Sequence, residues 1–187
     1  MIRNCVKITV VAALLAALPS CGRLADLVPL PTQPPLAGVP AELPVAALDT
    51  PLHSALNDPG SVLYFIRAQV LTNLPPDTLA QLPDLKLAGE VAVSGATGAI
   101  LDWYVRTSMD GCTQLSGAGA WSCPAATEQP AFLGSTPITT AARPFGPWTH
   151  PRLKSLLTGG VFIGLRVSAG QLGPGAALNA RLTVLTR

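Results

Sequence analysis

The chain of 187 residues is poor in charged side chains, which make up 12% of it. It carries 12 Lys and Arg residues against 10 Asp and Glu residues, so its net charge is only +2. A protein that holds nucleic acid or an anionic membrane surface by charge carries a larger basic excess. The sequence therefore predicts no nucleic-acid partner.

Catalytic motifs are also missing. The chain has no G-x-S-x-G elbow, no P-loop, no H-E-x-x-H motif and no dinucleotide-binding glycine pattern. Its two histidines, His53 and His150, are too few and too separate for an imidazole-rich metal centre. We expect no enzymatic activity, no cofactor and no metal, and we expect His150 to cap a turn rather than act as a general base.

The apolar run at the start of the chain is short. It covers eleven residues, Ile8 to Leu18, and follows the basic residues Arg3 and Lys7. A helix of eleven residues rises about 16 Å, which is roughly half the hydrocarbon thickness of a bilayer. A cleaved export signal is therefore favoured over a transmembrane span.

The end of this run resembles the lipobox of bacterial lipoproteins. Leu18, Pro19, Ser20 and Cys21 match its pattern of leucine, any residue, a small residue and cysteine. The resemblance implies that residues 1–20 are removed and that the Cys21 thiol carries a diacylglyceryl group. It also implies a protein anchored to a membrane of the bacterial cell envelope and facing an oxidising extracytoplasmic compartment. Loss of Arg3 and Lys7 would leave ten basic and ten acidic residues.

The four cysteines agree with this location. If Cys5 leaves with the signal and Cys21 carries the lipid, Cys112 and Cys123 remain to pair with each other. A redox or metal site is the alternative, but ten intervening residues is not the C-x-x-C spacing. We expect a disulfide that closes the glycine-rich segment between the two cysteines.

Nineteen prolines and seventeen glycines predict many turns and few long helices. Prolines recur every few residues between Gly22 and Pro59, so residues 21–59 are predicted to be an extended, lipid-anchored tether. Its apolar content favours contact of some part with the folded domain or with a partner. Residues 51–58 form the one stretch of the tether that could make a helical turn.

Residues 60–187 show the period-two alternation of half-buried strands. Four segments alternate clearly, at residues 85–94, 100–107, 161–168 and 178–187, and two weaker ones lie at 61–72 and 131–140. Turn signals separate them, among them SGATG, MDG and GQLGPG. The predicted inward residues are Leu85, Leu87, Val91, Val93, Leu101, Trp103, Val105, Val161, Ile163, Leu165, Val167, Leu178, Ala180, Leu182 and Val184.

Strands at this spacing, without a helix repeated between them, predict one all-β domain. We expect an antiparallel β-sandwich, in broad pattern similar to a jelly-roll or galactose-binding-like domain. One short helix is predicted in HPRLKSLL, residues 150–157, with Pro151 in its first turn and Gly159 as its stop.

The candidate ligand-binding residues are aromatic and acidic. Trp121 and Trp148, the latter close to Phe145, are predicted to lie in loops, where they could stack on sugar rings or fold back as lids on the core. Asp110 and Glu128 flank the cysteine segment and could approach each other as a calcium site or a glycosidase-like pair.

Three further polar residues, Asp102, Tyr104 and Arg106, share the outward side of one strand, and we expect a solvated face there.

Two functions remain open. The first is a lipid-anchored envelope protein that acts by contact, as a structural or accessory subunit of a surface assembly with another envelope protein as its partner. The alternative is a carbohydrate-binding module that holds a glycan with its loop tryptophans.

Overall fold

The computed structural model describes residues 39–51, 54–70, 75, 77–78, 81–82, 84–115, 119–158 and 160–186. For residues 46–51, 54, 65 and 66 only the backbone is described. The expected signal, the lipidated Cys21 and the start of the tether lie outside these residues. The described residues all belong to one compact unit, Pro35–Arg187.

Eight antiparallel strands of the described residues form one sheet, with β4, β5, β2, β8, β3 and β6 in this order, β1 beside β8, and β7 beside β3. The strands are β1 (Glu42–Pro51), β2 (Ser61–Ala68), β3 (Lys86–Arg106), β4 (Thr113–Leu115), β5 (Ala120–Pro124), β6 (Phe132–Pro137), β7 (Arg143–Thr149) and β8 (Val161–Leu185). In the connections that the structure describes, four short 3-10 helices are found, η1 (Ser54–Asn57), η2 (Ala125–Thr127), η3 (Gln129–Ala131) and η4 (Pro151–Leu156). The predicted all-β antiparallel class is confirmed, and η4 occupies the position of the predicted helix.

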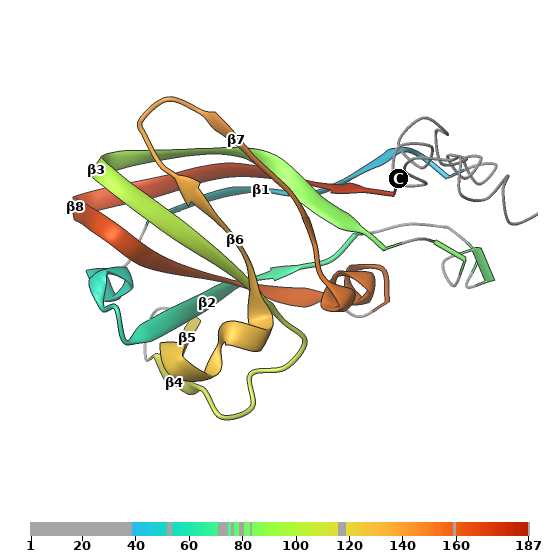
Figure 1. Cartoon of the computed structure of the whole chain (residues 1–187), viewed down its shortest axis with the longest axis horizontal. Coiled ribbons are helices and arrows are strands. Elements are labelled where there is room, and N and C mark those ends of the chain that lie inside the picture. The colour runs from blue at the N-terminus through green and yellow to red at the C-terminus, as the bar shows by residue number, and fades with distance from the viewer. Residues whose placement is uncertain are drawn as a thin grey trace, which may run out of the picture. The chain divides into compact units, whose positions relative to one another are not determined.

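The sheet has two halves, and the two long strands, β3 and β8, run through both of them. They pair from Lys86 with Leu185 at one end to Arg106 with Phe162 at the other (Figure 1). In one half they are flanked by β1 and β7, and in the other by β2 and β6. Trp103 from the second half stacks on Phe145 from the first, with ring centroids 4.6 Å apart. The halves therefore face each other, as in a sandwich.

Two predicted turns are wrong. SGATG lies inside β3 and GQLGPG lies inside β8, so each pair of predicted strands is one bent strand. The ladder between β3 and β8 shifts register between Ser94 and Ala96 and again between Thr97 and Ile100. Gly95 and Gly175 have φ near +70°, which only glycine adopts without strain. Glycines here permit bulges that bend the sheet, instead of a reversal of the chain.

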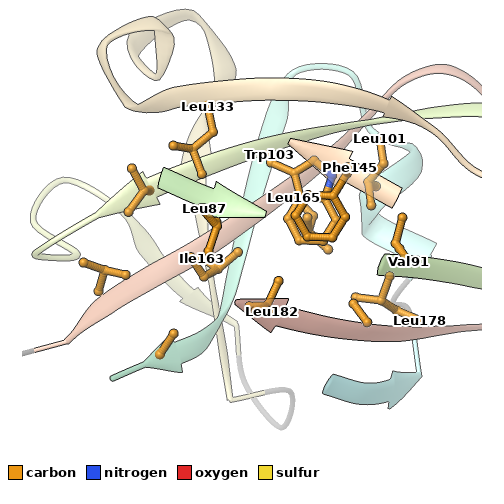
Figure 2. Packing of buried hydrophobic residues seen from close by; sticks show 14 of the residues in the cluster. Leu87, Val91, Leu101, Trp103, Leu133, Phe145, Ile163, Leu165, Leu178 and Leu182 are labelled. Atoms are coloured by element: carbon orange, nitrogen blue, oxygen red, sulfur yellow. The ribbon is translucent and has the colours of Figure 1, made fainter. Parts of the chain in front are cut away.

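The predicted inward face is confirmed, because every residue predicted to point inward is buried. These side chains form one hydrophobic core between the halves. Figure 2 shows Leu87, Val91, Leu178 and Leu182 pointing toward Trp103 and its neighbours. Burial of each large aliphatic side chain contributes roughly 1.5 to 3 kcal/mol to folding.

The folded domain begins before residue 60. β1, inside the predicted tether, pairs with β8 from Glu42 opposite Leu185 to Pro51 opposite Ala177. Within the described strands β1 has no second neighbour, and an edge strand tolerates prolines because half of its N–H groups face away from the ladder. Leu43 is buried in the core. The expectation of an extended tether through residue 59 is therefore wrong for β1, where pairing with β8 outweighs the proline content.

The predicted helical turn in residues 51–58 is confirmed as η1. The Asn57 side chain fastens this turn to β8, because its amide donates to the Leu172 carbonyl and its oxygen accepts from the Leu172 N–H, both at 3.0 Å.

Candidate functional site

The outward side of the second half of the sheet carries buried polar side chains. Asp102 and Tyr104 are each only 4% exposed, so the expected solvated face is wrong. Val62, Tyr64, Tyr104, Cys123 and Ala131 form a second apolar cluster on this side, which we call the outer cluster. The segment with β5, η2 and η3 supplies Cys123 and Ala131, and thus covers side chains that alternation alone would leave in water.

The predicted disulfide between Cys112 and Cys123 is confirmed, with a Cα to Cα distance of 4.5 Å. It links the loop after β3 to β5. Cys123 is fully buried in the outer cluster, whereas Cys112 is partly exposed at its edge. The bond therefore joins one fully buried cysteine to one partly exposed cysteine.

Arg106, the last residue of β3, lies against this bond. Its Nη1 donates to Cys112 Sγ at 2.8 Å and lies 3.4 Å from Cys123 Sγ. The same nitrogen lies 3.2 Å from Glu128 Oε1, and Nη2 donates to the Asp110 carbonyl at 2.9 Å. One guanidinium therefore ties together the strand, the disulfide and the turn between η2 and η3.

Glu128 is 3% exposed, which is unusual for a carboxylate, and both of its oxygens are engaged. Oε2 accepts a hydrogen bond of 2.5 Å from the hydroxyl of Tyr64, while Oε1 faces Arg106 and Thr127. Burial raises the pKa of Tyr64 well above its ordinary value, and the bond to Glu128 raises it further. Tyr64 is therefore a fixed donor at neutral pH, and the buried carboxylate is compensated.

The proposed pair of Asp110 and Glu128 meets at Arg106, but through different groups. Asp110 offers Arg106 its backbone carbonyl, while its exposed carboxylate accepts from Ser108 Oγ at 2.8 Å. Of these two residues, only Glu128 has a buried carboxylate. The described residues contain no group of three His, Cys, Asp or Glu side chains placed to hold a metal ion.

A second ion pair joins Asp102 to Arg166 of β8, with 2.8 Å between Oδ2 and Nη2. Asp102 Oδ1 accepts hydrogen bonds from Ser135 at 2.6 Å and from Ser168 at 2.9 Å. The bond to Asp102 raises the pKa of Arg166, and the guanidinium lies 5.9 Å from the centre of the Tyr104 ring. Sequence reasoning missed Arg166 and both serines; alternation in residues 161–168 places Arg166 outward but does not reveal its partner.

The two tryptophans expected in loops lie in strands, Trp148 in β7 and Trp121 in β5. Pairing with β3 and β2 draws these proline-bearing segments into the sheet. Trp148 stacks on Phe145 at 5.1 Å, and its ring occupies the space where a Cβ on Gly134 would stand. Phe145 is buried, so this aromatic pair closes the core.

Trp121 belongs to the other side of the sheet. It is partly buried against the outer cluster and meets the ring of Phe162 edge to face, with 5.4 Å between centroids. The Arg67 guanidinium lies 6.0 Å from the centre of the Phe162 ring. Trp121 and Trp148 therefore pack on different clusters and do not share one stacking platform.

His150 caps η4, as predicted. Its Nδ1 accepts from the backbone N–H of Arg152 at 3.1 Å, and its Nε2 lies 3.0 Å from the Pro130 carbonyl. Both ring nitrogens are thus engaged with backbone groups, and the imidazole joins η3 to η4. The predicted stop at Gly159 lies outside the described residues.

In the part of the chain that the structure describes, no helix combines the length and apolar character that crossing a membrane requires. A comparison with models of known protein families found none that matches the chain, and a comparison with curated proteins found no significant match.

Proposed function

We propose that this protein is a lipid-anchored protein of the bacterial cell envelope that acts by contact, as a structural or accessory subunit of a surface assembly. Its lipidation site is Cys21, which follows the short apolar run in the sequence. Its partners are a membrane, held through the acyl chains, and a second envelope protein.

The observation that carries the contact role is that each buried carboxylate on the outward side of the sheet is paired with an arginine and is therefore not available for catalysis. Glu128 pairs with Arg106, and Asp102 pairs with Arg166. The serines beside Asp102 donate to a carboxylate that is already paired with a cation, which is a poor base for activating a nucleophile. These groups hold strands and turns together, and the disulfide adds a covalent link that suits an oxidising compartment.

Anchoring is tested by the intact mass and membrane fractionation of the protein expressed in a bacterial host. We expect a membrane-bound product that begins at a diacylated Cys21. Cys21→Ser should abolish the lipid mass and release or misprocess the chain, since stable residence requires two or more acyl chains. Cys5→Ser is the matched control and should change nothing, because Cys5 leaves with the signal. An unmodified Cys21 in most molecules contradicts the anchor.

The contact role is tested by crosslinking in intact cells, followed by purification from detergent-solubilised membranes. We expect one partner in constant ratio to this protein, retained when Asp102→Asn or Glu128→Gln removes an internal ion pair without unfolding the domain. A monomer without a crosslinked partner, or a hydrolytic activity that either substitution abolishes, contradicts the proposal.

Carbohydrate binding is the alternative, and it rests on Trp121. Trp121 is partly exposed and adjoins Phe162 on the outer side of the sheet, where an aromatic ring can stack on a sugar ring. Binding to a glycan array that Trp121→Ala abolishes and Trp148→Ala leaves intact would select this function over the contact role. The second substitution is the control, because Trp148 packs on the core.

A further inference from the structure

The Arg106 guanidinium is a cation held beside the two sulfurs, and it is also paired with Glu128. Its Nη1 lies 2.8 Å from Cys112 Sγ and 3.4 Å from Cys123 Sγ. Its bonds to Glu128 and to the Asp110 carbonyl hold it in place independently of the sulfurs. A cation next to a cysteine lowers the pKa of the thiol, and the thiolate is the nucleophile in thiol chemistry.

Exposure differs between the two cysteines. Cys123 has no exposed surface, while Cys112 is partly exposed at the edge of the outer cluster. A reagent from solution therefore reaches Cys112 first. Cys123 lies behind it, positioned as the second thiol of an exchange reaction.

We propose that Cys112 is a thiol–disulfide exchange site that Arg106 activates, and that its substrates are low-molecular-weight organic disulfides. In the reduced protein the Cys112 thiolate attacks one sulfur of the organic disulfide, which forms a mixed disulfide and releases one thiolate. The Cys123 thiolate then attacks Cys112 Sγ, which forms the protein disulfide and releases the second thiolate. The protein loses two electrons, the organic disulfide gains them, and the two protons of the protein thiols pass to the two released thiols.

Besides Arg106, three groups from the surrounding elements determine the charge at this site. The Glu128 carboxylate opposes the guanidinium, since both face the same nitrogen, Nη1. Tyr64 is neutral and holds the other oxygen of Glu128. The Asp110 carboxylate is engaged by Ser108. Removing the charge of Arg106 and removing the charge of Glu128 should therefore shift the Cys112 pKa in opposite directions, although both changes break the same ion pair.

The test uses the full chain with Cys123→Ser, which leaves one thiol at the site. The pH dependence of Cys112 alkylation by iodoacetamide, followed by mass spectrometry of the Cys112 peptide, gives the pKa of that thiol independently of Cys5 and Cys21. We expect the midpoint in the folded protein to lie about 1 pH unit below the midpoint in urea. Equal midpoints overturn the proposal, whether the thiol is unperturbed or the variant does not fold.

Charge variants then separate activation from structural support. Arg106→Gln should return the midpoint to its value in urea, and Glu128→Gln should lower it further. Arg152→Gln is the control, because Arg152 donates to the Val105 carbonyl and not to sulfur. A shift in the same direction for Arg106→Gln and Glu128→Gln overturns the proposal. If Arg106→Gln does not fold, Glu128→Gln decides alone, and an unchanged or raised midpoint counts against the proposal.

Turnover is measured on the chain with both cysteines. After reduction and removal of the reductant, we expect glutathione disulfide to restore the bond between Cys112 and Cys123 roughly fivefold faster in the parent than in Arg106→Gln. Equal rates overturn the assignment of Arg106. The outcome is independent of lipidation, since exchange at Cys112 requires only the folded domain.

Discussion

The ring of Trp103 on β3 stacks on the ring of Phe145 on β7, with 4.6 Å between their centroids and 20° between their planes. The two residues belong to opposite halves of one continuous sheet, so this contact joins the halves across the core. Gly89 makes the contact possible, because a Cβ at this position would collide with the Arg181 carbonyl and with the Phe145 ring.

Phe145→Ala should therefore lower the free energy of unfolding by about 3 kcal/mol or more, since it removes a buried ring and leaves a cavity. Gly89→Ala should also destabilise the domain, by forcing Phe145 and the neighbouring backbone apart. Urea denaturation followed by tryptophan fluorescence measures both effects. Thr140→Ala, at an exposed position, is the control. A change below about 1 kcal/mol for Phe145→Ala would show that the halves do not depend on this contact.

The raised pKa of Tyr64 predicts a loss of stability in alkali. Because the folded-state pKa lies above the ordinary value of about 10, the stabilisation is complete below that pH and declines as the pH rises above it. Tyr64→Phe should reduce the slope of unfolding free energy against pH between about 9.5 and 11. Part of the slope should remain, because burial also raises the pKa of Tyr104. A slope equal to that of the parent contradicts the buried-phenol interpretation.

Asp102→Asn should destabilise the domain by about 2 kcal/mol, because Arg166 would keep its charge without its partner. Ser135→Ala and Ser168→Ala should each cost about 1 kcal/mol or less, as each removes one hydrogen bond to Asp102. A double-mutant cycle between Asp102→Asn and Arg166→Gln measures the coupling. Strict additivity of the two substitutions would mean that the ion pair contributes nothing to stability.

Leu43→Ala tests whether the chain before residue 60 belongs to the folded domain. Leu43 is buried in the core, so its truncation should cost about 2 kcal/mol. Glu42→Ala, on the exposed neighbour, should have little effect. Equal effects of the two substitutions in thermal unfolding would place β1 outside the cooperative unit.

The strands and the core were predictable because alternation is a local property. In a strand, successive side chains point to opposite faces, so the positions of Leu87, Trp103, Leu165 and Leu182 in sequence suffice to place them inside. The same reasoning correctly placed Asp102 and Arg106 on the opposite face. It could not reveal that the segment around η2 and η3 covers this face, because that depends on how the chain returns after β5.

Local composition was misleading where a tertiary contact outweighs it. The prolines of residues 42–51 suit a tether, but this segment pairs with β8 as an edge strand, on the side of β8 that β3 does not occupy. The glycines of SGATG suit a turn, yet they lie opposite β8 and bend the ladder instead of reversing it. In each case the outcome depends on a strand that is distant in sequence.

The sequence by itself determined the all-β class, the inward face, the disulfide and the cap at His150. The class, the inward face and the cap follow from neighbouring residues, whereas the disulfide was predicted from the four cysteines only together with the lipoprotein resemblance, which sets Cys5 and Cys21 aside. Only the tertiary structure decided which charged groups meet, since Tyr64 reaches Glu128 and Asp102 reaches Arg166 across 64 positions of the chain in both cases. The register of paired strands sets such contacts, and register is a cooperative property of the whole sheet that no single segment encodes.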